Sequence, residues 1–217
     1  MAEVPRFKIV VMETIMSNVN TEGRKIHPHK FALWLAMGSI SMMFAGLTSG
    51  YMVRQAQGNW RYFKLPPVFT ISTVVILVSS FTFFLGIKAF KNREIPKFRM
   101  LILTTLILGI AFGLLQYMGF YQLYHSVQQV SINGQMLKEF TPVRVDGNPS
   151  ESFLFVIAGL HLAHILGGLV ALLITFLRTF RTKVKVYNAT GLEIVGGYWH
   201  FVDALWLYLF VFFLANQ

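Results

Sequence analysis

The sequence contains no cysteine, which excludes several kinds of functional site. Without a thiol, the chain has no means to form disulfides, to attach a c-type haem, or to hold copper or iron–sulfur clusters through thiolates. Glycine-rich phosphate loops, nucleophile triads and paired catalytic carboxylates are also missing. The residues therefore predict no catalytic or metal site of these kinds.

Charged residues are also scarce, because only 13% of the 217 residues are Asp, Glu, Lys or Arg, whereas 55% are hydrophobic. A soluble domain is typically about a quarter charged. Four long stretches contain no charged residue, and a fifth contains only Asp203. Each is long enough to cross about 30 Å of hydrocarbon as a helix. The five predicted spans cover residues 31–53, 65–87, 100–124, 152–177 and 194–215.

The sequence therefore predicts an all-α fold, a polytopic transmembrane bundle of five helices, because helices satisfy the backbone of such stretches within lipid. We divide the chain into an N-terminal tail, residues 1–30, and one membrane domain, residues 31–217. Within the tail, the segment "FKIVVMETIM" predicts a short helix at the membrane surface. The tail lacks the apolar core of a signal peptide, so we expect no cleaved leader.

Basic residues cluster on one predicted side of the membrane. The tail and the loops after the second and fourth spans hold fourteen of the 19 Lys and Arg residues. The positive-inside rule therefore predicts a cytoplasmic N-terminus and a C-terminus outside. We interpret the net charge of +10 as a signal for orientation and for contact with lipid headgroups, and not for nucleic-acid binding.

Ionisable side chains occur inside the last two spans. His161 and His164 lie three residues apart in the fourth span, and His200 and Asp203 have the same spacing in the fifth. Residues at this spacing share one face of a helix. Counted from the opposite ends of the two spans, His161, His164 and Asp203 reach similar depths. Because ionisable groups in lipid normally pair with one another, we predict an interhelical polar cluster of these four residues.

The residues leave three functions open for this cluster. Paired histidines on neighbouring helices are able to hold a haem, with Gly167 and Gly168 making room for the porphyrin. Histidine and aspartate within the membrane also suit a proton relay, but the first two spans contain no His, Asp, Glu, Lys or Arg to continue it. The third function is structural, with polar contacts that fix helix packing or hold a lipid. The residues favour this third interpretation.

Small residues predict close contacts between helices. Gly46 and Gly50 in the first span, and Gly109 and Gly113 in the third, have the spacing that lets helix backbones approach each other. We assign these pairs, together with the glycines at 167 and 168, to packing inside the bundle. A dimer interface is the alternative for the two spaced pairs.

The longest connection between spans, residues 125–151, contains turn signals such as "INGQ" and "VDGNPSES". Asn148 or Ser150 is the predicted N-cap of the fourth helix, with Pro149 in its first turn if Asn148 is the cap. Because the predicted topology places this loop outside, we consider it a candidate docking surface.

Several spans carry specific motifs. The fourth reads "GLHLAH" followed by "GG", the fifth region reads "GLE" and then "YWHFVDALWLYLF", and the first contains "SISMMFAGLTSGY". Together these motifs resemble subunit III of the haem-copper oxidases, of which cytochrome c oxidase is the best-known member. The resemblance covers nearly the whole chain after the tail. Five spans resemble the short bacterial form, which lacks the first two helices of longer members, and Ile40 stands where many members have a glutamate.

The resemblance implies a non-redox subunit of a proton-pumping terminal oxidase in a bacterial inner membrane, which reduces oxygen to water with electrons from cytochrome c. It implies no catalytic residue, metal or cofactor in this chain, because partner subunits I and II hold the haem and copper. It also implies contact with subunit I, stabilisation of that subunit, support of proton uptake and bound phospholipid. Small subunits and a respiratory supercomplex are further implied partners.

Four more residues are predicted to make contacts at the chain's surface. Glu193 and Arg178 are expected near the cytoplasmic face, in contact with lipid headgroups or with each other, and Trp199 and Trp206 are expected to contact lipid or a partner. Two rival functions stay open for the whole chain. Quinol-oxidising haem-copper oxidases carry a very similar subunit III, and a lone proton-coupled transporter would also place ionisable residues in lipid.

Overall fold

Five long helices make up most of the computed structural model, which describes residues 28–58, 60–62, 65–125, 128–132, 135–141, 148–180 and 190–216. The helices are α2 (Pro28–Ala56), α3 (Val68–Lys91), α4 (Ile95–His125), α5 (Pro149–Arg178) and α6 (Thr190–Ala215). All five are long and apolar enough to cross a membrane. The predicted five-helix bundle is therefore confirmed, whereas the predicted surface helix of the tail lies outside the described residues.

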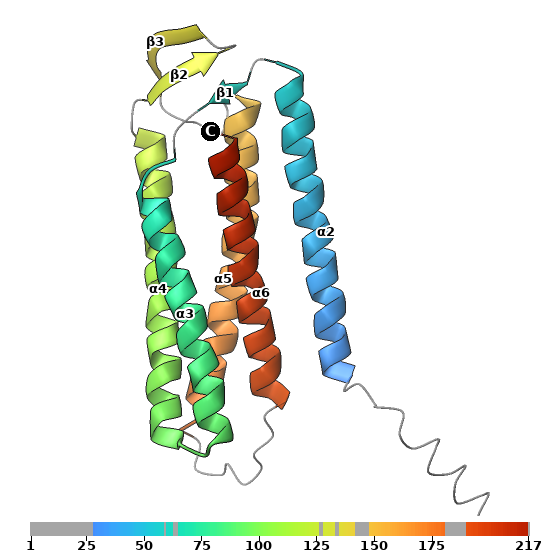
Figure 1. Cartoon of the computed structure of the whole chain (residues 1–217), viewed down its shortest axis with the longest axis vertical. Helices are drawn as coiled ribbons and strands as arrows, with labels where there is room; N and C mark the ends of the chain where they lie inside the picture. The colour runs from blue at the N-terminus through green and yellow to red at the C-terminus, as the bar shows by residue number, and fades with distance from the viewer. Residues whose placement is uncertain are drawn as a thin grey trace, which may run out of the picture.

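The two ends of the bundle differ in character, and Figure 1 shows them at the top and bottom of the view. At one end, here called the sheet end, α2 and α4 finish, α5 begins and the C-terminus lies close to a small sheet. At the other end, α2, α4 and α6 begin, and α3 and α5 finish. We call it the basic end, because its helix ends carry Lys30, Lys88, Lys91, Lys97, Arg99 and Arg178.

A three-stranded antiparallel sheet covers the sheet end and was not predicted. It consists of β1 (Arg61–Tyr62), β2 (Gln128–Ile132) and β3 (Gln135–Thr141), in the order β1-β2-β3. The first strand follows α2 and the other two follow α4, so the sheet joins two connections that are far apart in sequence. The segment that we treated as a turn-rich loop therefore contains paired strands.

The helix α5 begins where the sequence predicted. Asn148 is its N-cap, with an extended backbone, and the Asn148 side-chain oxygen accepts a hydrogen bond from the Ser150 amide at 3.1 Å. Pro149 occupies the first turn. Backbone amides in the first turn have no partner within the helix, so a proline there costs no hydrogen bond. The cap fixes the start of the helix that carries His161 and His164.

The core lies between α3, α4, α5 and α6, while α2 stands at the side of this group (Figure 1). Only three residues of α2 are buried, whereas α5 and α6 each bury nine. Large aromatic rings fill much of the core, and those that are almost fully buried are Trp199, Trp206, Phe44, Phe69, Phe83, Phe98 and Phe112. Rings of this size set the distances between the helices and therefore position the polar side chains among them.

Candidate functional site

The imidazole of His161 is buried among aromatic rings. Its side chain is 1% exposed and stacks on Trp206 of α6, with the ring centroids 5.2 Å apart and the planes inclined by 28°. Phe112 of α4 and Phe44 of α2 meet the same imidazole edge-on. Neither imidazole nitrogen has a hydrogen-bond partner among the described residues. His161 therefore connects α5 to three other helices through ring contacts.

His164 lies one turn further along α5 and has a different set of contacts. Its Nδ1 atom is 2.7 Å from the backbone oxygen of Leu160, on the same helix. The ring of Phe44 meets the imidazole edge-on at 5.8 Å. The Tyr198 hydroxyl of α6 donates a hydrogen bond to the His164 backbone oxygen at 3.1 Å. A polar link between α5 and α6 thus exists at this level, and it uses the backbone of His164.

His200 and Asp203 on α6 both lie beside Ser80 of α3. The Ser80 hydroxyl and the His200 Nδ1 atom form a short hydrogen bond, 2.5 Å between the two atoms. The Ser80 side chain also lies close to the Asp203 carboxylate, although neither carboxylate oxygen has a well-aligned hydrogen-bond partner in the described part of the chain. Asp203 is 2% exposed. This pair of residues therefore faces α3.

The four residues of the predicted cluster thus have different neighbours. The His161 side chain contacts α2, α4 and α6, and the His164 side chain contacts α2, while His200 and Asp203 contact α3. Among the described residues, no hydrogen bond joins two of the four side chains. Direct bonding between the imidazoles and Asp203 therefore stays a prediction. Spacing in sequence shows which residues share a helix face, but the rotation of each helix decides which neighbour that face meets.

Sequence reasoning missed a series of hydroxyl and amide groups along α3 and α4. The Trp206 indole donates to the Thr73 hydroxyl at 3.0 Å, and the Gln116 amide donates to the Ser72 hydroxyl at 2.9 Å. Further along α3, the hydroxyls of Thr82 and Thr105 are 2.9 Å apart. The available signal was the repeated Ser and Thr of the second span, since such residues often bond across helices in membranes.

Trp199 and Trp206 require a correction, because neither lies at the surface of the chain. Trp199 is fully buried and Trp206 is 2% exposed, so the predicted contact with lipid or a partner is wrong for both. Both rings point into the bundle instead. The indole N–H of Trp206 donates its hydrogen bond to Thr73. The indole nitrogen of Trp199 has no partner among the described residues.

The glycines predicted to support helix packing fall into three groups. A methyl group on Gly168 or Gly109 would lie 2.9 Å from the ring of Trp199, so these two glycines form the slot that holds this ring. Gly50 and Gly167 would have ordinary contacts, with Phe153 and with Tyr198. At Gly46 and Gly113 nothing described lies within 4 Å. Of the spaced pairs only Gly109 makes a tight contact, and of the adjacent pair only Gly168 does.

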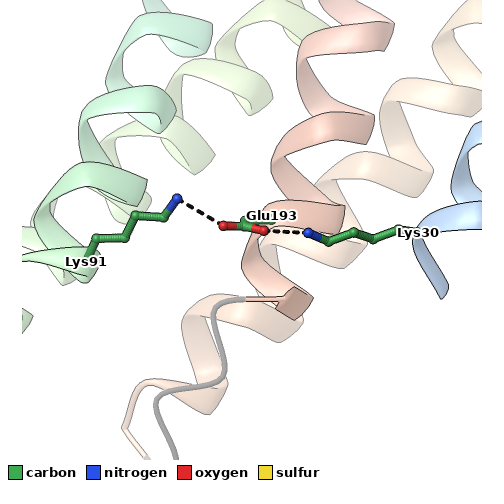
Figure 2. Close-up of polar contacts among 3 residues, drawn as sticks. All are labelled: Lys30, Lys91 and Glu193. Carbon is green, nitrogen blue, oxygen red and sulfur yellow. Dashed lines mark hydrogen bonds and ion pairs between the residues drawn. The ribbon is translucent and has the colours of Figure 1, made fainter. Parts of the chain in front are cut away.

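Glu193 joins three helices at the basic end (Figure 2). One of its carboxylate oxygens is 2.8 Å from the Lys30 ammonium of α2, and the other is 2.9 Å from the Lys91 ammonium of α3. Glu193 itself lies in the first turn of α6. Glu193 therefore pairs with two lysines, and no ion pair between Glu193 and Arg178 occurs among the described residues.

A pocket of about 420 Å³ opens beside Arg178 at the basic end. Phe90, Phe98, Ile174 and Val195 supply much of its apolar wall, and Arg178 lines it together with two threonines. One of these, Thr179, ends α5, and its backbone oxygen accepts a hydrogen bond from Arg99 at 2.7 Å. The pocket thus combines an apolar interior with a cation.

Within the described residues, no group of three or more His, Cys, Asp or Glu side chains is arranged to hold a metal ion. The two histidines of α5 both adjoin Phe44 edge-on. One of them is stacked against Trp206, which leaves no open face on that side for a flat ligand such as a porphyrin.

Comparison with known proteins shows which protein family this chain resembles. The family model for cytochrome c oxidase subunit III matches residues 59–215. A probable cytochrome c oxidase subunit 3 of Nocardia farcinica is 30% identical over 183 residues, which are 82% of each chain. The corresponding Mycobacterium leprae protein is 30% identical over 186 residues, also 82% of each chain. Cytochrome c oxidase subunit 3 of Bacillus sp. PS3 is 26% identical over 199 residues, 89% of this chain and 86% of that one.

The matched region contains α3 to α6 and therefore every residue of the predicted polar cluster. The five span-capable helices and the bacterial relatives together identify a multi-pass protein of the bacterial inner membrane. Since these relatives are oxidase subunits, the chain is part of an oxidase complex. The chain belongs to the cytochrome c oxidase subunit III family.

Proposed function

We propose that this chain is the non-redox subunit III of a proton-pumping terminal oxidase that reduces oxygen to water with electrons from cytochrome c. The observation that carries the proposal is the family match over residues 59–215, together with relatives named as cytochrome c oxidase subunits. In this function the haem and copper belong to subunits I and II, and this chain stabilises subunit I. Subunit II and small subunits are further partners, and a respiratory supercomplex is their largest assembly.

A stabilising function fits a bundle whose helices are joined by specific contacts. Ring stacking connects α5 to α6, hydroxyl contacts connect α6 to α3, and ion pairs attach α2. Such a rigid bundle offers a fixed surface against which another membrane subunit packs.

We propose that the basic end faces the cytoplasm, because positively charged loop residues normally stay on that side. Support for proton uptake would then act from the same side, where the complex takes up protons from the cytoplasm. The pocket beside Arg178 suits a phospholipid, with an acyl chain against the apolar wall and an anionic headgroup at the guanidinium.

One experiment tests both the electron donor and the subunit composition of the complex. The complex is purified through an affinity tag on this chain. Co-purification of haem-bearing subunits, and oxygen consumption driven by reduced cytochrome c but not by quinol, are the expected results. Oxygen consumption with quinol but not with cytochrome c would assign the chain to the quinol-oxidising haem-copper oxidases. Isolation of a stable lone chain with transport activity, and without haem-bearing subunits, would overturn the proposal.

Lipid binding and proton uptake need separate measurements. Mass spectrometry of the Arg178→Gln complex is expected to show less bound anionic phospholipid, while Arg54→Gln at the sheet end serves as the matched control. Equal lipid content in both variants would contradict the lipid site. For proton uptake, we expect a complex stripped of this chain to turn over more slowly as pH rises, and an unchanged pH profile would contradict that function.

A further inference from the structure

The helix α2 is attached unevenly to the other four helices. Its three buried residues, Phe44, Thr48 and Tyr51, all lie in the half that ends near the sheet. Tyr51 packs edge-on against Phe212 of α6, with ring centroids 5.2 Å apart, and Phe44 meets the two histidines of α5. The half of α2 nearer the sheet is therefore anchored in the core.

The half of α2 at the basic end has a weaker attachment, because none of its residues is buried. Residues 28–37, here called the arm, contribute the ion pair of Lys30 with Glu193 of α6. Leu33 of the arm lies beside α6, where a methyl group on Gly197 would be 3.4 Å from it. A contact between two partly exposed charges thus supplies much of what holds the arm to the bundle.

Glu193 balances a concentration of positive charge at this end (Figure 2). Both α2 and α6 begin here, so the positive ends of two helix dipoles lie close together. Lys30 near the start of α2 and Lys91 in the last turn of α3 add two full charges, and both contact the Glu193 carboxylate. Without that negative charge, the start of α2 would be repelled from α6.

A weak point in α2 separates the arm from the anchored half. Glycine is among the least favourable residues in a helix interior, and a methyl group on Gly38 would meet no described atom within 4 Å, so close packing does not require it. The hydroxyls of Ser39 and Ser41 bond to backbone oxygens one turn earlier, and such bonds often bend helices. Residues 38–41 thus have the composition at which helices kink.

We propose that the arm turns about residues 38–41 and is held against α6 by the ion pairs of Glu193. Loss of the Glu193 charge, or its screening by salt, releases the arm. An arm of ten residues is about 15 Å long, so a bend of about 20° moves its free end about 5 Å from α6. The movement uncovers the surface of α6 around Gly197, which ionic conditions thereby control.

Distances between two spin labels in the intact complex test this movement. One label is placed at Phe31 in the arm and the other at Met100 near the basic end of α4, because both side chains are exposed. Unnatural ketone amino acids carry the labels, so cysteines of other subunits do not react. We expect Glu193→Gln to lengthen this distance by about 3–5 Å. Labels at Val53 and Tyr117, toward the sheet end, should keep their distance.

Glu94→Gln is the matched control, because it removes an ion pair with Lys97 at the same end without involving α2. An unchanged distance in Glu193→Gln, or an equal increase in the control, would overturn the movement. High salt should lengthen the distance in the unmodified complex. If the Glu193→Gln chain is lost from the complex, this salt series decides, and a distance that does not respond to salt would overturn the proposal.

Gly38→Ala tests the position of the hinge. Alanine favours the helix, so the double variant with Glu193→Gln should show a smaller increase in distance than Glu193→Gln alone. Gly46→Ala is the control, because it also meets no described atom within 4 Å but lies in the anchored half. An increase that is the same with and without Gly38→Ala would overturn this position for the hinge.

Discussion

The imidazole of His161 stacks on the indole of Trp206, with ring centroids 5.2 Å apart. The same indole donates a hydrogen bond to Thr73, so one aromatic side chain of α6 links α5 to α3. Both rings are buried near the middle of their helices. Trp206, which sequence reasoning assigned to the surface, is therefore a central packing residue of the bundle.

Thr73→Val tests the hydrogen bond to this indole. Valine keeps the shape of threonine but leaves the buried Trp206 nitrogen without a partner, so we expect a loss of about 1–3 kcal/mol in the free energy of unfolding. Thermal unfolding of the purified complex measures it. Thr104→Val is the control, because that exposed hydroxyl binds only the Met100 backbone oxygen, and similar losses for the two variants would contradict the interpretation.

Gly168→Ala tests the slot for Trp199. The added methyl group would lie 2.9 Å from a ring carbon of Trp199, so the ring or the helix must shift. We expect destabilisation of about 1–3 kcal/mol, the usual cost of overpacking. Gly113→Ala meets nothing within 4 Å and should be neutral or slightly stabilising, because alanine favours helix. Equal shifts in the unfolding midpoints of Gly168→Ala and Gly113→Ala would contradict a tight slot around Trp199.

Glu193→Gln tests the ion pairs that attach α2. Loss of the contacts with Lys30 and Lys91 should cost about 1 kcal/mol, because the three side chains are partly exposed. High salt should reduce the difference from the unmodified chain, since it screens the charges. Glu94→Gln breaks a single, more exposed pair with Lys97 and should have a smaller effect. Salt-independent unfolding of Glu193→Gln would argue against an electrostatic attachment.

Asp203→Ala is expected to weaken retention of this chain in the complex. The change removes a buried carboxyl beside Ser80 and leaves a small cavity between α3 and α6. A loss of about 1–2 kcal/mol would lower the ratio of retained to lost chain roughly five- to thirtyfold. Asp203→Asn keeps the size and polar character and should be retained better. The measured quantity is subunit stoichiometry after purification, and unchanged stoichiometry and thermal stability in Asp203→Ala would refute this prediction.

The number of helices and their approximate positions were predictable, because they depend on local properties of the sequence. A stretch such as 152–177 has no charge and exceeds the membrane thickness, so it forms a helix whatever its neighbours are. The start of α5 was equally local, since Asn148 and Pro149 act within one turn. The strands were signalled only by Asn133-Gly134, a hairpin dipeptide that we grouped with the turn signals.

The partners of the polar and aromatic side chains were decided by the tertiary structure. Sequence spacing placed His200 and Asp203 on one face of α6, but the rotation and tilt of the helix turned that face to Ser80 of α3. It also turned Trp199 into a slot between Gly109 and Gly168. The sequence by itself thus determined which segments are helices in lipid. Packing determined which groups meet, because side-chain shape complementarity among several helices is not encoded in any one of them.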